Sequence, residues 1–196
     1  MPTEQIVARV RRALLLDSTA FEEIRDDAAW TPICLGLAAV AVLLGGFGSW
    51  LWGEVVLPST PSGWFVDTAI FGTIFTILLL LAGVLVTYVV LTQVFRETAA
   101  PDAVIRLVTL THIPFALSFF VFIPQIGFAF GILTIASMFY YTTFGLRAAY
   151  PSVAPLRVMV AVLAGFALWA LILPLISDYP DNNFGTGVFV YSLFEP

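Results

Sequence analysis

The chain alternates long apolar stretches with short polar ones. Apolar runs cover about residues 30–52, 64–95, 107–144 and 156–176. An apolar run of eighteen or more residues is the signature of a helix that crosses a membrane, for which about twenty residues suffice. The pattern predicts an all-α integral membrane protein.

The run at 107–144 holds no charged residue, and its 38 residues are too many for one transmembrane helix and about right for two. Pro124 interrupts a helix, since proline lacks the backbone N–H, and Gln125 adds a polar side chain at the same point. We therefore predict two spans joined by an outer turn at Pro124 and Gln125, with the first span kinked at Pro114. Five transmembrane helices result.

The arginines test this count. All eight basic residues are arginines, and they precede the first predicted span or lie between spans two and three or spans four and five. The other side receives only acids: Glu54, Asp178, Asp181 and Glu195. Because cytoplasmic loops are enriched in Lys and Arg, five spans place every arginine on one side. We expect a multi-pass protein of the cell inner (plasma) membrane, with a cytoplasmic amino terminus and an outside, periplasmic carboxyl terminus.

Three regions follow. Residues 1–29 form a cytoplasmic amphipathic segment, residues 30–176 the five-helix domain, and residues 177–196 an outward-facing tail. Residues 3–16 have the periodicity of a helix lying in the headgroup plane. Thr19 and Glu22 have capping-box spacing, which predicts a second short helix with Phe21 and Ile24 facing the bilayer. A solvated connector helix without a partner is the alternative for this segment.

Composition removes several classes of function. The net charge of −5 leaves no basic patch to neutralise phosphates, so nucleic acid is not an expected partner. The single cysteine, Cys34, forms no internal disulfide and no thiolate metal site by itself. No serine or cysteine stands at a recognisable spacing from a histidine and an acid, so we predict no enzyme, no catalytic residue and no cofactor.

Two polar residues inside the predicted spans are candidates for chemistry. His112 could ligate a haem or a pigment, but a histidine near Pro114 can equally bind backbone carbonyls that the proline frees. We prefer the second interpretation and place His112 toward the cytoplasmic end of the third span. Asp67 lies just inside the outer end of the second span, where Thr68 or interfacial water can satisfy it.

Small residues four positions apart mark helix-packing faces. Three such pairs occur in the predicted spans: Ala41 and Gly45, Gly127 and Gly131, and Ala161 and Gly165. They predict a tightly packed bundle, either within one chain or against a partner.

Three stretches carry a family resemblance: "ALLLDSTAFEEIRDDAAWTPICLGL", "LTQVFRETAAPDAVIRLVTLTHIPFAL" and "YYTTFGLRAAYPSVAPLRVMVAVL". Over about residues 10–175 the chain resembles a prokaryotic member of the Yip (Ypt-interacting protein) domain family. The resemblance implies a cytoplasmic amino segment, five spans and a non-enzymatic role. Eukaryotic members bind small GTPases, but their acidic-Leu-Tyr-Gly pattern is missing here, so GTPase binding is not carried over.

Two functions remain. The chain is a Yip-like scaffold that oligomerises or binds other membrane proteins in the lipid bilayer. Alternatively, it is an accessory subunit packed at the periphery of a photosynthetic or respiratory complex, which the aromatic tail "FGTGVFVYSLFEP" favours. A transporter needs intramembrane polar residues on facing helices, and the sequence nearly lacks them.

Overall fold

The computed structural model describes residues 2–57, 59–60 and 62–176, and every regular element in them is helical. The predicted breaks at Pro58 and Pro61 and the predicted tail at 177–196 lie outside the described residues. The elements are α1 (Thr3–Leu14), α2 (Ser18–Asp26), η1 (Ala28–Trp30), α3 (Thr31–Val56), η2 (Val66–Phe71), α4 (Gly72–Val89), η3 (Val90–Val94), α5 (Pro101–Leu110), η4 (Ile113–Phe122), α6 (Gly127–Ala149) and α7 (Pro155–Ile176).

Four of these helical segments are long and apolar enough to cross a membrane: Ala28–Val56, Val66–Val94, Pro101–Phe122 and Gly127–Ala149. The all-helical class and a membrane location agree with the prediction from sequence. In α7 the apolar stretch Pro155–Trp169 is shorter than a full span. The fifth crossing therefore stays a prediction.

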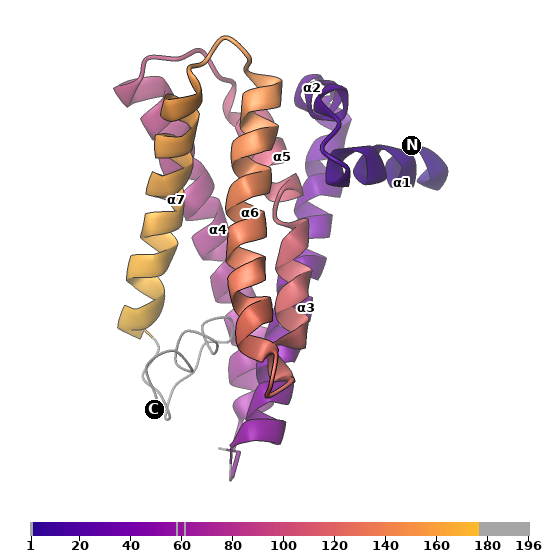
Figure 1. The fold of residues 1–196 in the computed structure, drawn as a ribbon, viewed down its shortest axis with the longest axis vertical. Helices are drawn as coiled ribbons and strands as arrows, with labels where there is room; N and C mark the ends of the chain where they lie inside the picture. The colour runs from indigo at the N-terminus through magenta and orange to yellow at the C-terminus, as the bar shows by residue number, and fades with distance from the viewer. Residues whose placement is uncertain (1, 58, 61, 177–196) are drawn as a thin grey trace.

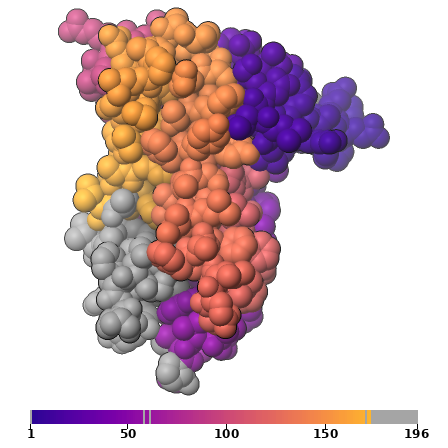
Figure 2. Space-filling model, viewed as in Figure 1, coloured from indigo at the N-terminus to yellow at the C-terminus, as the bar shows by residue number. Residues whose placement is uncertain are grey.

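The helices α3 to α7 run along the long axis of the molecule, and α1 and α2 lie at one end of it (Figure 1). The last turns of α4 and α6 and the first turns of α5 and α7 meet at that same end. The helix α1 extends across the axis and projects from the side of the body (Figure 2). The arginine-bearing segments are thus gathered at one end of the bundle.

The third apolar segment changes its helix type halfway. The His112 N–H bonds the Thr109 carbonyl, three residues back, and Pro114 has no N–H to restore the α pattern. The chain continues through η4 as a 3₁₀-helix, which rises about 2.0 Å per residue against about 1.5 Å in an α-helix. Ten residues of η4 therefore reach about 20 Å. The expected kink at Pro114 is a transition to a longer, thinner helix.

The turn between η4 and α6 is made by Pro124, Gln125 and Ile126, all of them exposed. Gly127 follows at the start of α6, and a β-carbon there would lie 2.1 Å from the Val121 carbonyl oxygen. Only glycine lets the returning helix approach so closely.

The small residues noted in the sequence lie inside the bundle. A β-carbon on Gly45 would lie 2.5 Å from the Phe115 ring of η4, and one on Gly165 would lie 2.7 Å from the Gly83 carbonyl oxygen of α4. Ala41, Gly131 and Ala161 are also buried. These faces hold α3 against η4 and α7 against α4 within a single chain.

Candidate functional site

A buried arginine joins α2 to the bundle of apolar helices. Arg106 of α5 is 3% exposed, and its guanidinium donates to the carbonyls of Ile24 (Nε, 3.1 Å) and Arg25 (Nη2, 2.6 Å). Its Nη1 donates to Thr31 Oγ1 (3.1 Å) and to the Asp102 carboxylate (2.7 Å). The two carbonyls belong to the last turn of α2, where helix carbonyls lack partners and the dipole favours a cation. Arg106 therefore caps α2.

The inner face of α2 is covered by protein. Phe21 and Ile24 are 1% and 0% exposed, and the Phe21 ring stands edge-on to Phe144 of α6 at 5.8 Å. The Phe21 ring also fills the space over Gly145, where a β-carbon would lie 2.8 Å from it. The prediction that Phe21 and Ile24 face the bilayer is wrong, because the end of α6 takes up the apolar face.

Further contacts make α1 and α2 one body with the bundle; we call α1 and α2 together the arm. Arg25 donates to the Ala149 carbonyl at the end of α6, and the Tyr141 hydroxyl donates to the Leu14 carbonyl at the end of α1 (2.7 Å). The Arg9 guanidinium lies 4.9 Å from the centre of the Trp30 ring. The arm thus has contacts to both η1 and α6.

An ion-pair cluster holds the bend between α1 and α2. Arg12 donates to Asp17 (2.8 Å) and to Glu23 (2.9 Å). Asp17 accepts the Thr19 N–H (3.0 Å), so Asp17 and not Thr19 caps α2. The Thr19 hydroxyl and the Arg12 guanidinium both bond to the Asp17 carboxylate and lower its pKa to about 2.

The second feature is a cavity inside the bundle. It measures about 40 Å³, counted as the space open to the centre of a water molecule, and it is partly open to the outside. Its wall comes from α3, α4, α5, η4, α6 and α7, through residues such as Val42, Leu80, Met138 and Gly165. Each of these lies near the middle of its helix, so the cavity lies midway along the bundle.

His112 lies in this wall and is 7% exposed. The span begins at Pro101 rather than near Leu107, so His112 is at its midpoint and not toward the cytoplasmic end. Its Nδ1 donates to the Val108 carbonyl at 2.6 Å. The His112 N–H does not take up that carbonyl, because it bonds the Thr109 carbonyl instead. The other ring nitrogen, Nε2, has no partner among the described residues.

Threonines supply further polar groups of the wall, and Trp169 contributes its indole N–H. Thr87 and Thr134 each donate to a carbonyl of their own helix, at 2.9 and 2.8 Å. The Thr142 and Thr111 hydroxyls lie 2.9 Å apart, and Thr111 donates to the Val108 carbonyl (2.8 Å). Thr142 is therefore the donor between the two.

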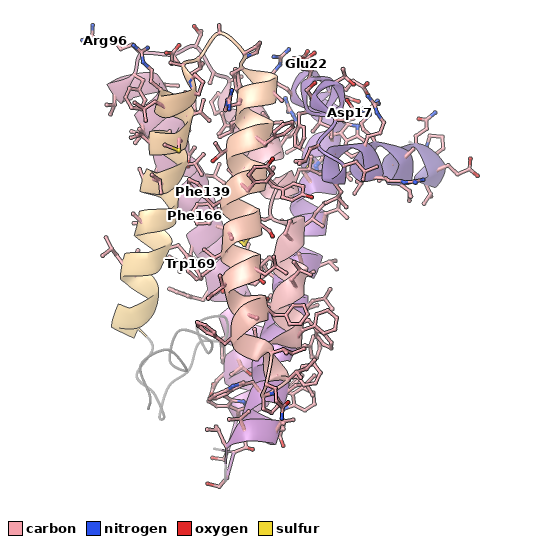
Figure 3. The ribbon with its side chains drawn as sticks, viewed as in Figure 1. Asp17, Glu22, Arg96, Phe139, Phe166 and Trp169 are labelled. Carbon is pink, nitrogen blue, oxygen red and sulfur yellow. The ribbon has the colours of Figure 1, made fainter. Side chains whose placement is uncertain are left out.

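The rest of the wall is apolar and aromatic. Figure 3 shows Phe166 and Trp169 of α7 between α7 and α6, with Phe139 of α6 beside them. The Phe166 ring lies 6.3 Å from the His112 ring and 5.8 Å from the Phe139 ring. Pockets for drug-sized ligands measure about 300–1,000 Å³, so this space is too small for a haem or a chlorin. Among the described residues no group of three metal-ligating side chains comes together.

Asp67, the other candidate, lies away from the cavity, in η2 near the far end of the bundle. Thr68 does not satisfy it, because the Thr68 hydroxyl donates to the Trp64 carbonyl (2.7 Å). The structure brings Asp67 and His112 to different places.

Arg106 and Gly83 were overlooked as site residues from the sequence. In the sequence, Arg106 indicates only which side of the membrane its loop lies on. Gly83 and Thr87 are four residues apart, a spacing that could have identified the α4 face that α7 packs on.

No protein-family model, no curated protein and no solved structure matches this chain. The Yip resemblance therefore rests on the quoted stretches of sequence alone, and these comparisons give it no support.

Proposed function

We propose that the chain is a non-enzymatic, five-span scaffold of the inner membrane, which holds its arm against the cytoplasmic leaflet and gathers other membrane proteins or further copies of itself. The observation that carries this proposal is the fixed arm. A helix pair that served only as a leader into the first span would need no buried arginine to hold it. Fixing a segment in advance lowers the entropy cost of binding through it.

The surface of α1 supports a place in the headgroup region. Val7 of α1 and Leu15, the residue that follows α1, are 61% and 71% exposed, and α1 projects sideways from the bundle (Figure 2). Ile6 and Val10 share its apolar side and also pack on the bundle core. An amphipathic helix at this level inserts its apolar face at the boundary between headgroups and acyl chains.

The Yip resemblance agrees with a scaffold role and belongs to the same proposal. The accessory-subunit alternative depends on the tail at 177–196, which lies outside the described residues. No described feature favours that alternative.

Topology is tested with single cysteines. Cys34, the only natural cysteine, is buried, so Cys34→Ala gives a cysteine-free background. With five spans, an impermeant thiol reagent labels a cysteine at Gln125 and one appended at the carboxyl terminus in intact cells. A cysteine at Leu15 reacts only after permeabilisation. Labelling of Gln125 without the carboxyl-terminal cysteine would leave four spans and contradict the proposal.

The scaffold role is tested by purifying the tagged protein in mild detergent and identifying the co-purifying proteins by mass spectrometry. We expect a stoichiometric partner or a homo-oligomer. The Arg106→Leu variant should lose this association, and the Arg157→Leu variant should retain it. A wild-type protein that is always an isolated monomer contradicts the scaffold. A photo-crosslinker at Val7 is expected to capture lipid, and one at Gln5, on the polar side of α1, is not.

A further inference from the structure

Most polar groups that the structure describes in the wall of the cavity have already used their hydrogens and offer only acceptors, while Trp169 adds one indole N–H. The Nδ1 hydrogen of His112 is used by the Val108 carbonyl. The hydroxyl hydrogens of Thr87 and Thr134 go to carbonyls of their own helices, and that of Thr142 goes to Thr111. These groups therefore present only lone pairs to the cavity.

The strongest of these acceptors is Nε2 of His112. A carbonyl can only accept, so the contact with Val108 makes Nδ1 the protonated nitrogen. An imidazolium in the middle of a membrane is costly, and among the described residues none that lines the cavity is an acid that would pair with it. The ring is therefore neutral, and Nε2 has a free lone pair in a buried place. An unsatisfied polar atom costs free energy that a ligand with a donor recovers.

The wall also defines what surrounds that donor. The wall is mostly apolar through Phe115, Phe166, Trp169 and Met138, and no charged side chain lines it in the part of the chain that the structure describes. A charged ammonium donor would lose its hydration without gaining a counter-ion. A neutral hydroxyl group on an apolar body satisfies both conditions.

Size gives the last condition. A water molecule needs about 10–15 Å³ of such space, so about 40 Å³ accepts a hydroxyl group and a few carbons. The partly open side lets the remainder of a longer molecule extend toward lipid. A lipid-soluble alcohol enters from the membrane, where it is already dissolved.

We propose that this cavity binds a neutral, lipid-soluble alcohol, whose hydroxyl group donates to Nε2 of His112 and whose apolar body lies against Phe166 and Trp169. The proposal stands independently of the scaffold role.

The chain has one histidine, so ¹⁵N-histidine labelling of the full-length protein in nanodiscs reports on His112 alone. Nitrogen NMR is expected to show a protonated Nδ1 and an unprotonated Nε2. 1-Octanol should shift the Nε2 signal saturably, and its isomer di-n-butyl ether, which has no donor, should not. Both are added at levels that leave the circular dichroism unchanged.

A cavity-filling variant gives the second measurement. Thr134→Leu occupies the space from α6 without touching the Nδ1 contact, and it should abolish the octanol response. Thr92→Leu is the matched control, because Thr92 makes the same contact to its own helix (2.9 Å) and lies outside the cavity. It should keep the response.

Several results would overturn the proposal. They are a protonated Nε2, equal shifts with the two isomers, an octanol response that survives Thr134→Leu, and an Nε2 signal that octanol does not move. The last result would mean that water alone occupies the site.

Discussion

The guanidinium of Arg106 donates to the backbone carbonyl of Ile24 over 3.1 Å, although 82 residues separate the two. The donor belongs to a helical segment that is long and apolar enough to cross a membrane, and the acceptor belongs to the arm. A charge that would be costly in the bundle is satisfied by the carboxyl end of α2, and α2 gains a cap that its own sequence lacks.

Arg106→Leu should detach the arm. It leaves the Ile24 and Arg25 carbonyls without their donors and lowers the free energy of unfolding by about 2–4 kcal/mol, because hydrogen bonds from a buried charge are costly to lose. Denaturant unfolding in detergent measures this loss. Trypsin cleavage after Arg25, mapped by mass spectrometry, should accelerate in the variant.

The matched control is Arg157→Leu. Arg157 pairs with Glu97 at 2.6 Å but is 50% exposed, and exposed ion pairs contribute little. We expect a change within about 0.5 kcal/mol and unchanged cleavage after Arg25. Equal losses in the two variants would contradict a special role for Arg106.

The Asp17 carboxylate should make the bend of the arm sensitive to acid. Its pKa in the folded chain is about 2, below the ordinary value of 3.8. A depressed folded pKa means that the contribution is fully present above about pH 4 and is lost as the pH falls toward 2. Asp17→Asn keeps a capping side chain but removes the titration.

The measurement is the distance between spin labels at Leu15 and Tyr140, both exposed, followed from pH 5 to pH 2. The wild type should hold a narrower distribution than Asp17→Asn at pH 5, and the difference should shrink as the pH approaches 2, where the carboxylate is partly protonated. A difference in distance distribution between the two proteins that does not change with pH would contradict this role of Asp17.

Gly48 should tolerate no side chain. A β-carbon there would lie 2.5 Å from the Ser118 carbonyl oxygen and 2.6 Å from the Phe119 Cα, both backbone atoms of η4. Gly48→Ala therefore forces α3 and η4 apart and costs about 1–3 kcal/mol in unfolding free energy. Thermal unfolding in detergent reports it.

Gly36 lies on the same helix with nothing within 4 Å of the position of a β-carbon. Gly36→Ala should be neutral or stabilise the chain by up to about 1 kcal/mol, because alanine favours the helix. Similar losses at both positions would show that helix propensity, rather than contact with η4, governs α3.

The apolar runs predicted the helical class and the separate third and fourth segments, because backbone groups in a membrane must be satisfied within each helix. The position of α2 could not be predicted in this way. A pattern such as Phe21 and Ile24 shows that one helix face is covered, but not whether lipid or protein covers it. Phe144 and Gly145, distant in sequence, decide it.

One cause explains two differences between sequence and structure. Arg106 was expected to lie before the third span, which delayed the expected start of that span to about Leu107. In the folded chain α2 and Asp102 satisfy Arg106, so the helix begins at Pro101. His112 then moves from near one end to the middle, where it lines the cavity. Long-range hydrogen bonds of this kind leave no local signal.

In the hairpin formed by η4 and α6, Gly127 should not tolerate substitution, whereas its neighbours in the turn should. Its β-carbon would meet the Val121 carbonyl at 2.1 Å, and its N–H bonds the Ile123 carbonyl at 2.6 Å. Gly127→Ala must open the turn and separate η4 from α6. Gln125→Ala changes an exposed side chain and should leave the hairpin intact.

Cross-linking of cysteines at Phe120 and Phe130 by a short bifunctional thiol reagent measures the opening in a Cys34→Ala background, because the two rings lie 5.1 Å apart across the hairpin. Cross-linking should be efficient in Gln125→Ala. It should be strongly reduced in Gly127→Ala, because in that variant η4 and α6 move apart. Since the clash is with backbone, no rotamer change relieves it. Equal cross-linking in the two variants would mean that η4 yields without cost, and that Val121 does not set the path of the returning helix.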